Sequence, residues 1–87
     1  MKHAGTATLE SLGPLLKQIR QANLLRERKP GAFYLKSSGF LHFHEDSAGI
    51  FADLKIDGKF ERFPVTTLAE QQMFIAKFRE LMNSLKN

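Results

Sequence analysis

Hydrophobic and polar residues alternate through the middle of the chain, whereas near both ends the hydrophobic residues recur every three or four positions. A period of two is typical of a half-buried strand and a period near 3.6 of an amphipathic helix. The alternation predicts four strands, at residues 33–36, 40–45, 50–56 and 59–64. Turn-forming residues separate these runs, and Asp57-Gly58 is a strong signal for a tight hairpin.

The first helix is predicted to start near Ser11, a candidate N-cap, with Gly13 and Pro14 in its first turn. The hydrophobic residues that follow fall on one side of a helix, namely Leu12, Leu15, Leu16, Ile19 and Ala22. The sequence Lys29-Pro30-Gly31 is expected to end this helix, because proline pushes the residue before it out of the helical conformation.

The second helix has a clearer start. Thr67 and Glu70 have the spacing of a capping box, in which each side chain accepts a hydrogen bond from a free amide at the helix start. A hydrophobic stripe then runs almost to the end of the chain, through Phe74, Ile75, Phe78, Leu81, Met82 and Leu85.

Residues 1–10 show neither period and are predicted to be a flexible N-terminus, followed by a single α+β domain at 11–87. The predicted fold has two layers: a four-stranded antiparallel meander, with the N- and C-terminal helices on one face in the order α-β-β-β-β-α. The chain is near the lower size limit for folding alone and has no cysteine to form a disulfide, so self-association is one route to extra stability.

The register of the central hairpin follows from keeping its hydrophobic residues together. If Glu45 faces Ile50, then Leu41 and Phe43 lie under the helices and the polar residues point the other way. This register places His42 opposite Asp53 and, through the next turn, Asp53 opposite Arg62.

The sheet face away from the helices therefore contains the candidate site. Its predicted ligand or interface residues are His42, His44, Phe40, Phe51, Asp53, Lys55, Phe60 and Arg62. Phe33 and Leu35 are expected on the same face, which makes it unusually hydrophobic, and such a patch usually marks an interface or a groove.

Three interpretations of this face remain open. In the first, the chain is a non-enzymatic binding or assembly module that forms a homodimer through the sheet. In the second, exposed aromatic rings near Lys and Arg bind single-stranded nucleic acid. In the third, His42 and His44 bind a metal or a small anion with Asp53 or Glu45, although H-x-H alone is a weak metal signal.

The net charge of +4 comes from the first half of the chain, where Lys and Arg form a candidate basic patch that could attract phosphates or be a solvated helix end. Its members are Lys17, Arg20, Arg26, Arg28, Lys29 and Lys36. No catalytic residue is predicted, because the serines lie in turns without a nucleophile motif, and no cofactor is expected. The sequence shows no membrane span or signal peptide, so a cytoplasmic location is expected.

The segment FLHFHED, followed shortly by FADLK, resembles the central part of small conserved bacterial proteins of unassigned function. The resemblance covers residues 29–72 and implies a bacterial origin and a four-stranded sheet. It implies no activity, cofactor or site residue.

Overall fold

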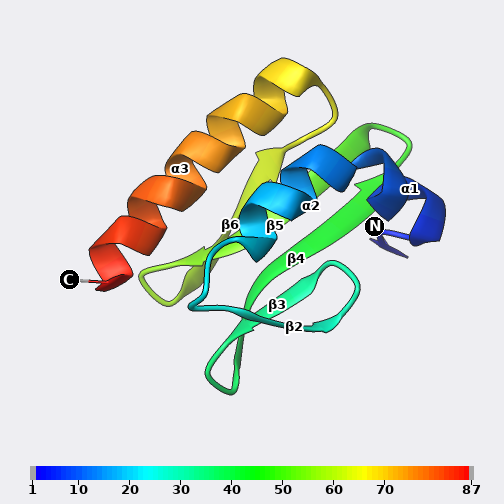
Figure 1. Ribbon diagram of the computed structural model, residues 1–87. Helices are drawn as coiled ribbons and strands as arrows, with labels where there is room; N and C mark the ends of the chain where they lie inside the picture. Colours follow the sequence, from blue (N-terminus) through cyan, green and yellow to red (C-terminus); the bar gives the residue numbers. More distant parts are fainter. Residues whose placement is uncertain (1, 87) are drawn as a thin grey trace.

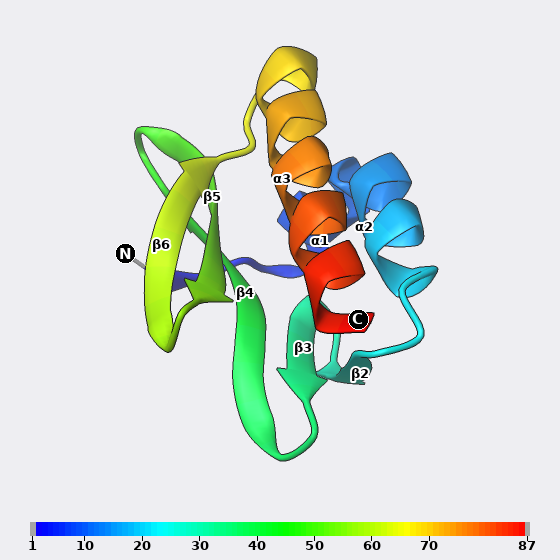
Figure 2. The same cartoon turned by 90° about the vertical axis from the view of Figure 1, so that its left-hand side faces the viewer.

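The computed structural model describes residues 2–86, so Met1 and Asn87, the outer ends of the two predicted ranges 1–10 and 11–87, lie outside it. Six strands form one antiparallel sheet, and the helices lie on one side of it (Figures 1 and 2). The elements are β1 (Lys2–His3), α1 (Thr6–Ser11), α2 (Gly13–Arg20), β2 (Arg26–Lys29), β3 (Ala32–Leu35), β4 (Ser38–Asp46), β5 (Gly49–Ile56), β6 (Lys59–Pro64) and α3 (Leu68–Lys86). The α+β class and the antiparallel meander are as predicted, but the sheet has two strands more than predicted.

The sheet runs in the order β2-β3-β4-β5-β6, and β1 pairs with β4. The predicted register of the last three strands is confirmed: Glu45 pairs with Ile50, and Asp53 pairs with both His42 and Arg62. Asp57 and Gly58 have φ angles of 52° and 81°, the positive values that a tight hairpin turn requires.

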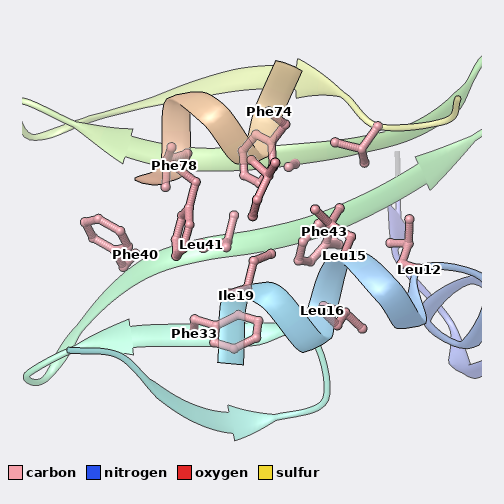
Figure 3. Close-up of a cluster of buried hydrophobic side chains, with 14 of the residues drawn as sticks. Leu12, Leu15, Leu16, Ile19, Phe33, Phe40, Leu41, Phe43, Phe74 and Phe78 are labelled. Atoms are coloured by element: carbon pink, nitrogen blue, oxygen red, sulfur yellow. The ribbon is translucent and has the colours of Figure 1, made fainter. Parts of the chain in front are cut away.

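The core lies between the sheet and the helices. Leu41, Ala52 and Leu54 of the sheet are fully buried, and Leu15 and Ile19 of α2 pack in the same cluster. Figure 3 shows Phe74 and Phe78 of α3 entering this cluster beside the side chains of β4. The inward direction predicted for Leu41 and Phe43 is therefore confirmed.

Phe40 is a correction: it was expected on the face away from the helices, yet it is 5% exposed and belongs to the core. The cause is a β-bulge. Phe33 pairs with Leu41 but the next residue, Tyr34, pairs with Gly39, so Phe40 is an extra residue in β4. Two consecutive residues of β4 are thereby buried, and the strict alternation assumed from the sequence is interrupted.

Phe33 and Leu35 are also corrections. Phe33 is 2% exposed and Leu35 packs partly buried against the core, so both lie on the helical side of β3. The face away from the helices is consequently less hydrophobic than the sequence suggested, and Tyr34 is the aromatic residue of β3 that it contains.

The first helix is shorter than predicted. It ends at Arg20, and Arg26–Lys29 forms the edge strand β2, paired with β3. Pro30-Gly31 is the turn of a hairpin and not the stop of a helix, since Gly31 has a φ of 76° and the chain reverses there. A strand made only of charged residues is tolerated at the edge of a sheet, where it discourages pairing with another chain.

Residues 2–11 contain two elements that the sequence did not predict, β1 and α1. Ser11 is the last residue of α1, where its hydroxyl donates to the Thr8 carbonyl, and it is not the cap of α2. By contrast, the capping box of α3 forms as expected: Glu70 N donates to Thr67 Oγ1 at 3.1 Å, and Thr67 N donates to Glu70 Oε1 at 3.0 Å.

Candidate functional site

The sheet surface that faces away from the helices is called the open face here. In β4, β5 and β6 it contains alternate residues, because successive side chains of a strand point to opposite faces of the sheet. In β3 and β2 the open face continues through Tyr34, through Arg26, which pairs with Tyr34, and through Arg28, whose guanidinium lies over the Tyr34 ring. Its members are Arg26, Arg28, Tyr34, His42, His44, Phe51, Asp53, Lys55, Phe60 and Arg62.

An ion-pair cluster occupies the middle of the open face. Arg62 donates two hydrogen bonds to Asp53, from Nε to Oδ1 at 2.8 Å and from Nη2 to Oδ2 at 2.9 Å. His44 Nε2 lies 3.1 Å from Asp53 Oδ2. The hydrogen bonds from Arg62 hold the pKa of Asp53 below its ordinary value, so this carboxylate stays charged and its negative charge is compensated.

The predicted row across the strands is thus formed in register, but a different histidine contacts the carboxylate. His42 pairs with Asp53 along the backbone, while the side chain that reaches Asp53 is the diagonal neighbour His44. The ring of His42 lies instead over Gly39, where an added Cβ would be 3.1 Å from its Nε2. The absence of a side chain at Gly39 gives His42 the room to lie toward β3.

An aromatic row, defined as Tyr34, His42 and Phe60, crosses the open face from β3 to β6. Tyr34 and His42 meet edge to face with ring centroids 6.5 Å apart, and His42 lies 5.2 Å from Phe60. A cation stands at each end: the guanidinium of Arg28 is 5.1 Å above the Tyr34 ring, and Lys55 Nζ is 5.5 Å from the Phe60 ring centre. Arg28 and Lys55 therefore flank the three rings of the aromatic row on one surface.

The three histidines of the chain gather beside this row. His3 of β1 stacks on His44 with centroids 4.9 Å apart, and His44 is 6.4 Å from His42. Partial burial lowers the pKa of His42, and the neighbouring His44 and His3 lower it further, so its neutral form is favoured. His3 was not identified from the sequence, because its place is set by pairing with a strand about forty residues away and nothing local marks it.

His42 and His44 were also weak metal candidates. Their rings are nearly perpendicular, at 87°, and His44 is engaged with Asp53. Between residues 2 and 86, no group of three or more His, Asp or Glu side chains is placed to hold a metal ion.

The predicted basic patch is divided between two surfaces. Arg20 is bound to Glu27 through two hydrogen bonds of 2.7 and 3.0 Å, and Lys17 projects from the same helix into solvent. Arg26 and Arg28 belong to β2, so they add positive charge to the open face beside Tyr34. Lys29 and Lys36 lie at the ends of the β2–β3 hairpin.

Cations exceed carboxylates on the open face. The face has four Arg and Lys side chains, Arg26, Arg28, Lys55 and Arg62, and the carboxylate of Asp53. Asp46 follows at the turn end of β4, where its carboxylate accepts a hydrogen bond from Ala48 N. The remaining aromatic residues of the face differ in exposure: Phe60 is 46% exposed, and Phe51 is partly buried. The surface thus combines exposed aromatic rings with an excess of positively charged side chains.

A scan against protein-family models matches none, and searches of the curated proteins and of the solved structures return no match. Within residues 2–86, no helix has the length and hydrophobicity needed to cross a membrane.

Proposed function

We propose that this protein is a non-enzymatic binding module whose open face holds single-stranded nucleic acid. The observation that carries the proposal is the aromatic row with a cation at each end, Arg28 beside Tyr34 and Lys55 beside Phe60. Proteins that bind single strands combine a positive surface for the phosphates with aromatic rings on which bases stack. The five strands from β2 to β6 give the single strand a path of about 19 Å, at about 4.8 Å per strand spacing.

Two features of the structure favour this function over face-to-face dimerisation. Phe33, Leu35 and Phe40, which made the face look like a hydrophobic interface, pack on the helical side. In a face-to-face dimer with two-fold symmetry, the positively charged open face of one protomer would also meet the same positively charged face of its partner, and the two would repel each other. The ion pair of Asp53 with Arg62 removes the further objection that a free carboxylate would repel phosphates.

The test is fluorescence anisotropy with a labelled single-stranded oligonucleotide of about ten nucleotides at two salt concentrations. We expect binding that weakens with salt, because each neutralised phosphate contributes about 0.7 to the slope of log affinity against log salt. Arg28→Gln and Lys55→Gln should each lower the affinity several-fold and reduce this slope.

Lys77→Gln is the matched control, because Lys77 is exposed on α3 in the helical layer and its loss changes the net charge by the same amount. We expect this variant to bind nearly as well as the unmodified protein. An equal loss in all three variants would mean that only the total charge matters, and no binding at low salt would end the proposal.

Self-association through the sheet is a second candidate, favoured by one observation: Phe60 is 46% exposed on the edge strand β6. A second copy that added its own β6 would cover this ring and extend the sheet. Sedimentation velocity tests it, since Phe60→Ala should convert a dimer to a monomer. A monomer across the micromolar range in the unmodified protein would exclude it.

A further inference from the structure

We propose that a pocket at the edge of β4 takes up one nucleobase, so that the module has base selectivity. This inference rests on the proposed binding of single-stranded nucleic acid and names the part of the site that would distinguish one sequence from another.

The pocket arises from the way two strands share one edge of β4. The pairing with β3 extends as far as Leu41, and the pairing with β1 starts at His44, with Ala4 N donating to the Phe43 carbonyl at 3.1 Å. Between these two pairings lies the start of β3 at Ala32, which follows the Pro30-Gly31 turn. A pocket of about 250 Å³ opens at this point, between the two strands.

The lining suits a planar ring with polar edges. Leu9 provides hydrophobic surface, while His3, His42 and Tyr34 provide aromatic faces and groups that both donate and accept hydrogen bonds. The volume lies below the roughly 300–1,000 Å³ of sites for drug-sized ligands, so it fits one ring system and not a longer segment. Unpaired bases are recognised by such combinations of stacking and hydrogen bonds to their edges.

The place of the pocket connects it to the aromatic row. Tyr34 and His42 line the pocket and also belong to the row, so a strand that follows the row passes the pocket mouth. Lys29 lines the pocket as well, and its exposed ammonium group can pair with the phosphate of the inserted nucleotide. The row therefore supplies affinity that tolerates any sequence, and the pocket supplies the preference for one base.

The experiment compares the affinities of the four homopolymeric oligonucleotides. It then compares a series of oligonucleotides that each carry one abasic nucleotide, placed at a different position in each. We expect one base to bind about tenfold more tightly than the weakest, and a single abasic position to remove this advantage. His3→Ala should reduce the preference at least threefold and leave binding of the weakest homopolymer unchanged, because His3 lines the pocket and lies outside the aromatic row. Tyr34→Phe should reduce the preference as well. Lys36→Gln, a variant in the β3–β4 turn outside the pocket, should preserve the preference.

A second measurement separates the pocket from the face as a whole. Free nucleoside monophosphates are titrated into the protein while the imidazole NMR signals of His3 and His42 are followed. If oligonucleotides bind without base preference and the monophosphates shift neither imidazole, the pocket proposal is wrong and the proposed function stands. If no oligonucleotide binds, the proposed function is wrong, and the monophosphate titration decides the pocket alone.

Discussion

Arg62 binds Asp53 through two parallel hydrogen bonds of 2.8 and 2.9 Å across neighbouring strands of the open face. This planar pairing is the strong geometry for an arginine and a carboxylate. It uses the charge of Arg62 to compensate Asp53, so the remaining cations of the face are available to a ligand.

Asp53→Asn is therefore expected to strengthen binding of single-stranded nucleic acid. The substitution removes one negative charge and releases Arg62 toward a phosphate, which should raise the affinity about three- to tenfold at low salt. Asp57→Asn is the matched control, because it makes the same charge change in an exposed turn at the edge of the sheet. Titration of one labelled oligonucleotide into each variant measures the effect, and equal gains in both would show that Arg62 plays no particular part.

The same ion pair predicts that the free energy of unfolding depends on pH in the acidic range. Arg62 lowers the pKa of Asp53 in the folded state, whereas in the unfolded chain an aspartate titrates near 3.9. Between these two pKa values the unfolded state binds more protons, so the contribution of Asp53 is complete above pH of about 4 and is lost as the pH falls through the folded pKa.

Urea denaturation measured from pH 6 down to pH 3 tests this sign. The free energy of unfolding should fall more steeply below about pH 4 in the unmodified protein than in Asp53→Asn. Glu27, whose pKa is lowered by hydrogen bonds from Arg20, adds a component of the same sign that both proteins retain. Parallel curves for the two proteins would contradict the role given to the ion pair.

Phe33 and Phe60 should differ sharply in their effect on stability. Phe33 is 2% exposed in the core, so Phe33→Ala is expected to cost about 3–5 kcal/mol in the free energy of unfolding. Phe60 is 46% exposed, and Phe60→Ala should cost under about 1 kcal/mol while weakening nucleic-acid binding by about 1–3 kcal/mol per lost stacked base. Chemical denaturation and anisotropy on the two variants check both halves of the prediction, and a similar loss of stability in both would mean that β3 faces the other way.

Gly49 is a further position that the structure constrains. It has a φ of 141°, and an added Cβ would come within 2.3 Å of Thr66 Oγ1, the atom that accepts from Ile50 N at 2.9 Å. Gly49→Ala should therefore cost about 1–3 kcal/mol in stability. Gly5→Ala, where an added Cβ meets nothing within 4 Å, is the control and should change stability by less than about 0.5 kcal/mol. A neutral result at Gly49 would contradict the close contact with Thr66.

The sequence predicted β4, β5, β6 and α3 well because their signals are local. The hydrophobic alternation predicted the inward residues and the register of the β4–β5 hairpin, Asp57-Gly58 extended that register to β6, and Thr67 with Glu70 predicted the start of α3. The contact between Asp53 and Arg62 at the centre of the site was predicted directly from the register of β5 and β6.

The rest depended on interactions that the sequence does not display locally. The bulge in β4 that buries Phe40 arises from pairing with β3, and the place of His3 arises from pairing with the far end of β4. The strand β2 was missed because its four residues are all charged. Pro30-Gly31 could have identified it as half of a hairpin, since the same dipeptide that stops a helix also forms a turn.

The most direct test of the central claim is to map the bound ligand by NMR of the aromatic side chains. On addition of excess single-stranded oligonucleotide, the ring signals of Tyr34, His42 and Phe60 should shift strongly, while those of Phe74 and Phe78 in the core should not. Shifts confined to residues of α2 and α3, or no shifts in the aromatic row at saturating oligonucleotide, would contradict the assignment of the open face as the binding surface.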